Sequence, residues 1–336
     1  MDIEPAVVHE ILVVHVSRIG DTLLATPALR ALAAAYPKAR LTCLAHPKRA
    51  EILQGLPFIH RLGHITKKSA PLRGWMPGRR YDLALVWGFD RPLVEYALRV
   101  AGRVAAFRQE DAKLDGRLWR AVPEPAFHTR NAVDYLLSLP EALGIPAAGR
   151  HLSYVVAAGE HAWAAQELAP LRARGVSPLL GLQIASFPTK GFRDWPVERF
   201  IELCRRIRGD HPAAHFLIFG GPLERERTQA LHAALSDCST HYAGRLTLRQ
   251  TGALMNELTL YVGVDTGPTH IMGALHRPMV AMYHGSSPSH FLAPLEHPCL
   301  WTVDHPRAGE GYDPDAYPMA DIPVDTVLAK VREALA

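Results

Sequence analysis

Four polar turns hold the residues of this 336-residue chain whose types and spacing could do chemistry. The first is Ser-Arg-Ile-Gly-Asp at residues 17–21, directly after an apolar run at residues 11–16. Gly20 lets the backbone turn tightly or approach a ligand. Asp21 stands where a helix is expected to begin. It would serve either as the helix N-cap or as a general base that accepts a proton from a reacting hydroxyl group.

The second turn, at residues 185–196, combines hydroxyl groups and cations ahead of a helix expected to begin near Pro196. Hydroxyl groups and cations before a helix N-terminus suit a phosphate group. An ordinary capped surface loop is the alternative. The candidate phosphate ligands are Ser186, Thr189, Lys190 and Arg193.

The third turn is Gly-Gly-Pro-Leu-Glu at residues 220–224. Its two glycines permit a sharp turn beside a ligand. Glu224 would accept hydrogen bonds from the diol of a ribose, or it would be a plain acidic residue in the first turn of a helix.

The fourth turn, Asp-Thr-Gly-Pro-Thr-His at residues 265–270, joins an apolar strand to a helix. Backbone N–H groups at the start of that helix would point toward an anion, and the helix dipole favours negative charge there. A buried Asp265 needs a partner, and the hydroxyl groups of a sugar would supply one. A structural turn with Asp265 as cap is the alternative.

These turns belong to a repeating strand–helix pattern, which is typical of parallel sheets. Ligands of such sheets bind at the carboxyl ends of the strands, where the four turns lie. Residues 60–80 are expected to form a loop. The predicted strands are residues 11–16, 40–45, 81–87, 104–107, 152–156, 178–184, 214–219, 260–264 and 278–282. The predicted helices are residues 22–36, 48–53, 92–101, 131–143, 161–174, 197–208, 224–235, 248–256, 269–275 and 324–335.

The length of the chain exceeds the size at which a single core stops growing, so two domains are expected. We predict two doubly wound, Rossmann-like α/β domains that face each other across a cleft. They would comprise residues 1–160 and residues 178–318, with a hinge at residues 161–177 and a terminal helical segment at residues 319–336.

Composition excludes several classes of protein. The net charge of +4 is too small for a nucleic-acid-binding chain. The four cysteines are too widely spaced for a zinc knuckle or a redox pair, and no His-Glu-x-x-His occurs, so we expect no metal. The acidic first ten residues are unlike a signal peptide, and the apolar runs are too short to cross a bilayer. We therefore expect a cytoplasmic protein.

Taken together, the four turns resemble those of glycosyltransferase family 9, the heptosyltransferases of lipopolysaccharide core assembly. VSRIGDTLLATPALRAL is similar to the family's opening motif, and VDTGPTHIMGAL to its D-[TS]-G-x-x-H signature. GGPLERER and ASFPTKGFRDWPVERF are similar to two further loops, and IPVDTVLAKVREAL to the family's ending. The resemblance runs from about residue 11 to the end of the chain.

The resemblance implies a GT-B fold, with an acceptor-binding first domain and a nucleotide-sugar-binding second domain. It implies inverting transfer of a heptose from ADP-L-glycero-β-D-manno-heptose to a lipid A–Kdo type acceptor, without metal or cofactor. Asp21 matches the family's general base. The residues that match its donor-binding positions are Ser17, Gly20, Glu224, Leu246, Asp265, Thr266, Gly267 and His270. The family commonly has a Lys where this chain has Arg193, so either Lys190 or Arg193 would bind the diphosphate.

The acceptor is expected to be an anionic, lipid-linked oligosaccharide bound by the basic segment at residues 60–80. A solvated basic loop is the alternative. The same surface, with the terminal helix, would rest on anionic lipid headgroups at the cytoplasmic face of the inner membrane. The candidate acceptor-binding residues are Arg61, Lys67, Lys68 and Arg73.

Other functions fit parts of the pattern. A transferase with another nucleotide sugar or acceptor, or a sugar-nucleotide epimerase, would use the same fold. A non-catalytic sugar-nucleotide-binding protein would retain the donor loops, although Asp21 argues against it. A nicotinamide dehydrogenase is disfavoured, because the first turn holds a single glycine in place of G-x-G-x-x-G.

Overall fold

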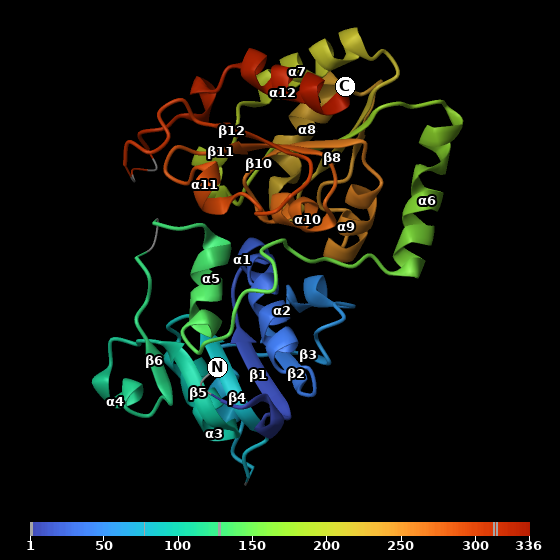
Figure 1. Cartoon of the computed structure of the whole chain (residues 1–336). Helices are drawn as coiled ribbons and strands as arrows, with labels where there is room; N and C mark the ends of the chain where they lie inside the picture. The colour runs from blue at the N-terminus through green and yellow to red at the C-terminus, as the bar shows by residue number, and fades with distance from the viewer. Residues whose placement is uncertain (1–2, 77, 127–128, 312, 314) are drawn as a thin grey trace. The chain divides into compact units, whose positions relative to one another are not determined.

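The computed structural model describes residues 3–76, 78–126, 129–311, 313 and 315–336. The chain divides into two compact units, Met1–Val155 and Val156–Ala336. Each unit holds one six-stranded sheet flanked by helices (Figure 1). The α/β class and the two doubly wound sheets that the sequence predicted are confirmed.

The first unit is built on a parallel sheet with the strand order β3-β2-β1-β4-β5-β6. β1 (Glu10–His15) pairs with β2 on one side and β4 on the other, so that Val13 lies between Cys43 and Leu85. β1 is almost wholly apolar because helices cover both faces of a doubly wound sheet. The other strands are β2 (Arg40–Ala45), β3 (Arg61–His64), β4 (Tyr81–Trp87), β5 (Ala101–Phe107) and β6 (Arg120–Val122).

Short helices surround this sheet. α3 packs against β1, β4 and β5, and α2 packs against α5. The helices are α1 (Ile19–Leu24), α2 (Thr26–Ala35), α3 (Arg91–Val100), α4 (Ala112–Asp115) and α5 (Ala132–Glu141). Single 3₁₀ turns are η1 (Pro5–Val7), η2 (Ala50–Leu53) and η3 (Ala70–Leu72).

The second unit contains another parallel sheet, in the order β12-β11-β10-β7-β8-β9. Counted from the first strand of each unit, this order is the same as in the first sheet. The strands are β7 (Leu179–Gln183), β8 (His215–Phe219), β9 (Ser239–His241), β10 (Leu260–Val264), β11 (Met279–Tyr283) and β12 (Leu300–Asp304).

In Figure 1, α7 and α12 lie on one face of this second sheet, and α9 and α10 lie on the other. Phe200 and Leu203 of α7 join Val327 of α12 in a core against the apolar strand residues. The helices are α6 (Ala158–Ala173), α7 (Val197–Asp210), α8 (Arg225–Ala234), α9 (Leu248–Asn256), α10 (Gly267–Leu275), α11 (Ser289–Leu292) and α12 (Val324–Leu335). The 3₁₀ segments are η4 (Pro188–Arg193), η5 (Pro222–Glu224) and η6 (Met319–Asp321).

The shared strand order fixes where each unit can hold a ligand. The chain reverses its direction across the sheet between β1 and β4, and again between β7 and β10. In doubly wound sheets, ligands bind beside the carboxyl ends of the strands at such a reversal. The loops after β1 and β10 therefore occupy the binding positions of their units.

Several predicted elements were wrong. The loop predicted at residues 60–80 contains β3 and η3, and the helix predicted at residues 22–36 is two helices, α1 and α2, that meet at Ala25 before Pro27. The edge strands β6, β9 and β12 were missed. Residues 48–53 hold only the short 3₁₀ turn η2.

The strand predicted at residues 152–156 is absent from the structure. Arg30 of α2 occupies the polar groups that a neighbouring strand would use. Its guanidinium donates to the carbonyl oxygens of Ala148 and His151 at 2.9 and 2.7 Å, and to Ser153 Oγ at 2.7 Å. The segment is thus held by a side chain and not by a sheet.

Candidate active site

Asp21 lies at the reversal point of the first sheet, in the first turn of α1. Ser17 Oγ donates a hydrogen bond to Asp21 Oδ2 at 2.6 Å, and the Arg18 N–H points to the same oxygen at 3.4 Å. Arg18 is the N-cap residue, so the alternative that placed Asp21 itself at the N-cap was wrong. Among the described residues, Asp21 Oδ1 takes part in no hydrogen bond, so one carboxylate oxygen remains available for chemistry.

Two side chains that the sequence did not single out support this turn. His15, at the end of β1, is buried, and its Nε2 lies 3.1 Å from the carbonyl oxygen of Asp21. Burial lowers the pKa of His15 despite the nearby negative charge of Asp21. Arg49 Nη1 donates to the carbonyl oxygen of Ser17 at 2.9 Å. A polar residue at the carboxyl end of an apolar strand was the only signal for His15.

The structure separates the four predicted acceptor-binding cations. Lys67 Nζ lies 3.5 Å from Asp90 Oδ1, which follows β4 at the reversal point. Lys67 and Lys68 thus follow the carboxyl end of β3, on the same edge of the sheet as Asp21. Arg61 begins β3 and lies at the opposite edge. Arg73 donates to the carbonyl oxygen of His64 at 2.6 Å.

Asp265 is the centre of the polar cluster in the second unit, directly after β10. Its side chain is only 4% exposed. Arg193 Nη1 donates to Asp265 Oδ2 at 2.8 Å, and His270 Nε2 lies 3.3 Å from Asp265 Oδ1. Arg193 Nη2 also donates to Ser287 Oγ at 3.1 Å, from the loop after β11. Three loops therefore converge on one carboxylate at the reversal point of this sheet.

The electrostatics of this cluster favour an ionised carboxylate. Burial by itself would raise the pKa of Asp265, but the neighbouring His270 and Arg193 outweigh that effect and hold its pKa below the ordinary value. A buried carboxylate that stays charged accepts hydrogen bonds strongly, so Asp265 is suited to bind hydroxyl groups.

The N-terminus of α10 follows Asp265 at once. Thr266 is the N-cap residue and Gly267 is the first helical residue. Thr269 Oγ1 donates to the carbonyl oxygen of Val264 at 2.6 Å and lies 2.7 Å from the hydroxyl of Tyr261. These bonds fix the first turn of the helix, where backbone N–H groups make a site for an anion.

The loop at residues 186–194 is held by its own polar groups. Ser186 Oγ donates to Asp194 Oδ1 at 2.6 Å, so this hydroxyl group is used within the loop. Arg227 of α8 forms an ion pair with Asp194 and donates to the carbonyl oxygen of Ser186. Neither Asp194 nor Arg227 was predicted, because their roles depend on a contact between distant segments. Thr189 is exposed, and Lys190 Nζ lies 5.3 Å from the centre of the Phe192 ring.

Glu224 and Leu246 lie on neighbouring turns. The N–H of Gly244 donates to the carbonyl oxygen of Gly220 at 2.9 Å and joins the two turns. Glu224 is buried and accepts a hydrogen bond from the N–H of Gly221. Burial raises the pKa of Glu224, although Gly221 and Arg227 oppose this. Leu246 is partly exposed just before α9.

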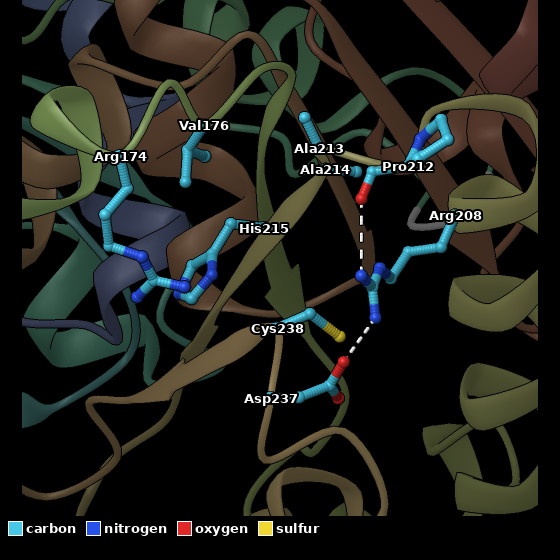
Figure 2. A pocket seen from close by; sticks show the side chains of 9 residues that line it. All are labelled: Arg174, Val176, Arg208, Pro212, Ala213, Ala214, His215, Asp237 and Cys238. Atoms are coloured by element: carbon cyan, nitrogen blue, oxygen red, sulfur yellow. Dashed lines mark hydrogen bonds and ion pairs between the residues drawn. The ribbon is translucent and has the colours of Figure 1, made fainter.

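A separate pocket lies at the opposite edge of the second sheet, where β8 begins (Figure 2). Arg208 bridges the Asp237 carboxylate and the carbonyl oxygen of Pro212 there. His215, the first residue of β8, faces this pocket and not the Asp265 cluster.

Two negative findings apply to the described part of the chain. Its His, Cys, Asp and Glu residues form no group of three or more that could hold a metal ion. None of its helices is both long enough and apolar enough to cross a bilayer.

The sequence model of glycosyltransferase family 9 (heptosyltransferase) matches residues 107–300, more than half of the chain. The chain belongs to glycosyltransferase family 9. It is thus a glycosyltransferase, and the predicted family and enzyme class are confirmed.

Relatives of this family 9 chain match it over most of their length. Lipopolysaccharide heptosyltransferase 2 of Salmonella typhimurium is 25% identical, over 86% of each chain. Lipopolysaccharide heptosyltransferase 3 of Escherichia coli is 23% identical, over 94% of this chain and 96% of the relative.

Solved structures agree on the fold. A family 9 glycosyl transferase from Veillonella parvula superposes with a TM-score of 0.83 at 20% identity, covering 100% of this chain and 98% of the other. The ADP-heptose lps heptosyltransferase II of E. coli superposes with a TM-score of 0.78 at 22% identity, covering 97% and 98%. These likenesses confirm the GT-B fold of this family 9 member.

Proposed function

We propose that this protein transfers a heptose from ADP-L-glycero-β-D-manno-heptose to a lipopolysaccharide core acceptor of the lipid A–Kdo type, with inversion at the anomeric carbon. The relatives named lipopolysaccharide heptosyltransferases support the substrate class. The observation that carries the proposal is the buried, ionised Asp265 beside the N-terminus of α10, because together they suit a sugar joined to a diphosphate.

In this proposal the second unit holds the donor. Asp265 accepts hydrogen bonds from hydroxyl groups of the heptose. The diphosphate lies at the N-terminus of α10, beside Thr266 and Gly267, with His270 behind it. Glu224 and Leu246, on joined turns, would receive the ribose and the adenine. A crystal of E. coli heptosyltransferase WaaC contains ADP-2-deoxy-2-fluoro heptose, which supports this class of donor.

Lys190 is the cation that we assign to the diphosphate. The Arg193 guanidinium already binds Asp265 and Ser287, and a guanidinium drawn away to a phosphate would leave a buried carboxylate with one partner fewer. A mobile lysine side chain binds phosphate as a point charge without that cost.

Asp21 is the proposed general base. As the acceptor hydroxyl attacks the anomeric carbon, its proton passes to Asp21 and the bond to the diphosphate breaks. Negative charge then grows on the leaving ADP. The α10 N-terminus and Lys190 stabilise that charge, and loss of one such donor costs on the order of 10²–10³ in rate. Neither a metal nor a cofactor is required in this scheme. Lys67 and Lys68 would guide an anionic acceptor to Asp21.

The test is Asp21→Asn, which keeps the size of the side chain and an oxygen for the Ser17 hydroxyl. Turnover should fall by about 10²–10⁴, because the proton acceptor is lost. ADP affinity by calorimetry and the melting temperature should be unchanged. Ser17→Ala is the matched control and should lose far less turnover. Near-normal turnover in Asp21→Asn would remove this residue from the mechanism.

A thermal-shift series with ADP-, GDP-, UDP- and dTDP-sugars tests the donor, since a bound ligand raises the melting temperature. The largest shift should come from ADP-heptose. A larger shift from another nucleotide sugar would point to a different transferase. Release of a free epimer would indicate an epimerase, and binding without transfer would indicate a non-catalytic protein. The four free cysteines are consistent with the reducing cytoplasm, where we propose that the enzyme works.

A further inference from the structure

The segment around η3 exposes more apolar surface than any other stretch of similar length in the described chain. Leu72, Trp75 and Met76 are 84%, 69% and 75% exposed. Three large apolar side chains within five residues form a patch, whereas single exposed apolar residues elsewhere need no explanation. We call residues 70–76 with Arg79, Arg80 and Arg99 the η3 surface.

This segment is held rigidly. Arg99, in the last turn of α3, donates to the carbonyl oxygens of Ala70 and Arg73 at 2.7 and 3.1 Å. Gly74 has a φ of +79°, and a Cβ there would lie 2.8 Å from Val100 Cγ1. The apolar side chains are therefore presented outward by a defined turn that is tied to α3, and only a glycine fits the turn.

Trp75 is prepared for an apolar surrounding. Its indole N–H donates to the carbonyl oxygen of Pro71 at 2.6 Å, so the ring can leave water without an unsatisfied donor. The Arg99 guanidinium lies 4.6 Å from the centre of the same ring. A ring with a satisfied polar group and an adjacent cation is suited to the interface between water and hydrocarbon.

The charge around the patch is of one sign. Residues 61–80 contain no Asp or Glu. The exposed cations nearest to the apolar residues in sequence are Arg73, Arg79 and Arg80. Basic side chains without acidic partners attract an anionic surface.

We propose that the η3 surface docks this protein on an anionic phospholipid bilayer, with Leu72, Trp75 and Met76 entering the headgroup region. A protein partner of comparable stability would need a complementary surface of about 800 Å² on each side. Three protruding side chains offer much less, whereas a fluid bilayer accepts protruding side chains of any shape.

The position of the surface suits an enzyme whose acceptor is held in a membrane. Lys67 lies beside Asp90 at the start of α3, and Gly74 lies beside Val100 at its end. The segment therefore runs along α3 from the edge of the sheet that carries Asp21 toward the opposite edge. The docking itself depends on neither donor nor acceptor, so it goes beyond the proposed transfer reaction.

Flotation of the full chain with vesicles tests the proposal. We expect binding to vesicles of equal parts phosphatidylglycerol and phosphatidylcholine, and little binding to phosphatidylcholine alone. Leu72→Ser/Met76→Ser should weaken binding at least about tenfold, because two apolar side chains no longer enter the interface. Arg79→Gln/Arg80→Gln should weaken it by about tenfold or more, and salt should weaken the binding of the unaltered chain.

Matched controls are Leu223→Ser and Arg205→Gln, which alter exposed residues of the second unit and should bind vesicles normally. Melting temperatures show whether each variant is folded. The proposal is overturned if the unaltered chain fails to bind anionic vesicles or if both double variants bind as it does. It is also overturned if the chain ignores vesicles but forms a dimer that Leu72→Ser/Met76→Ser separates, which would assign the patch to a second copy. Because the vesicles contain no acceptor, failure here leaves the transfer reaction untouched.

Discussion

The carboxylate of Asp265 depends on side chains from other loops for its charge. Arg193 supplies the guanidinium and Ser287 in turn holds Arg193, while His270 lies on the other side. These groups are separated by dozens of positions along the chain, so spacing could identify Asp265 and His270 as candidates but could not predict the pairing. The same holds for Arg227 and Asp194. Motifs predict which residues matter, whereas the fold decides which ones touch.

Lys190 and Arg193 should separate when they are replaced one at a time. Arg193→Ala should lower the free energy of unfolding by about 1–3 kcal/mol, because a buried carboxylate loses a charged partner. Lys190→Ala should change it by less than about 0.5 kcal/mol, yet weaken ADP binding about tenfold or more through the lost ionic contact. Chemical denaturation and calorimetry measure the two quantities. Weaker ADP binding in Arg193→Ala alone would reverse the assignment.

His215 should make the protein less stable in mild acid. Burial, followed by the charges of Arg174 and Arg208, lowers the pKa of His215 to about 4. As the pH falls below the ordinary value near 6.5, the unfolded chain binds a proton that the folded chain refuses. The free energy of unfolding should therefore fall by about 1.4 kcal/mol for each pH unit down to pH 4.

His215→Gln tests this prediction, because an amide can still bond to Thr240 but does not titrate. Urea unfolding between pH 4 and pH 7 should show a smaller slope in the variant than in the unaltered protein. Above pH 7 the two proteins should depend on pH alike. An identical slope over the whole range would exclude His215 as the cause.

At the scale of elements, apolar content decided what could be predicted from the sequence. The central strands β1, β4, β7 and β10 were found because helices cover them on both faces and the sequence must be apolar there. The edge strands β3 and β9 are short and partly polar, since an edge is only half covered, and they were missed. Residues 152–156 have the composition of a strand, but Arg30 satisfies the segment in place of a partner strand.

The helix α6 joins the second unit through two ion pairs of different quality. Arg249 of α9 donates to both carboxylate oxygens of Glu160 at 2.7 and 2.6 Å, and Arg249 is buried. At the other end of α6, Arg172 pairs with Glu257, but half of the Arg172 side chain is exposed. A buried, two-pronged pair holds an element far better than an exposed one.

Arg249→Gln should therefore lower the free energy of unfolding by about 1–3 kcal/mol and speed hydrogen exchange in the first turns of α6. Arg172→Gln is the matched control and should cost less than about 1 kcal/mol. Hydrogen exchange read by mass spectrometry reports on α6 directly. Equal effects of the two substitutions would contradict this ranking.

At the scale of the whole molecule, the chain has two separate cores, and each unit has its own sheet. Two cores of this kind allow unfolding in two steps. If the donor site belongs to the second unit, ADP should raise the temperature of one step by mass action and leave the other in place. Scanning calorimetry with and without ADP measures both steps. A single transition that shifts as a whole would show that the units unfold together.

Both sheets follow one strand order, so the chain contains the same scaffold twice. What distinguishes the copies is a few turn residues at equivalent places: Asp21 on the first, Asp265 on the second. Substrate choice is thus written in segments whose exchange leaves the cores intact. A family built this way can diversify by replacing short turns, and an engineer could redirect either half independently by the same route.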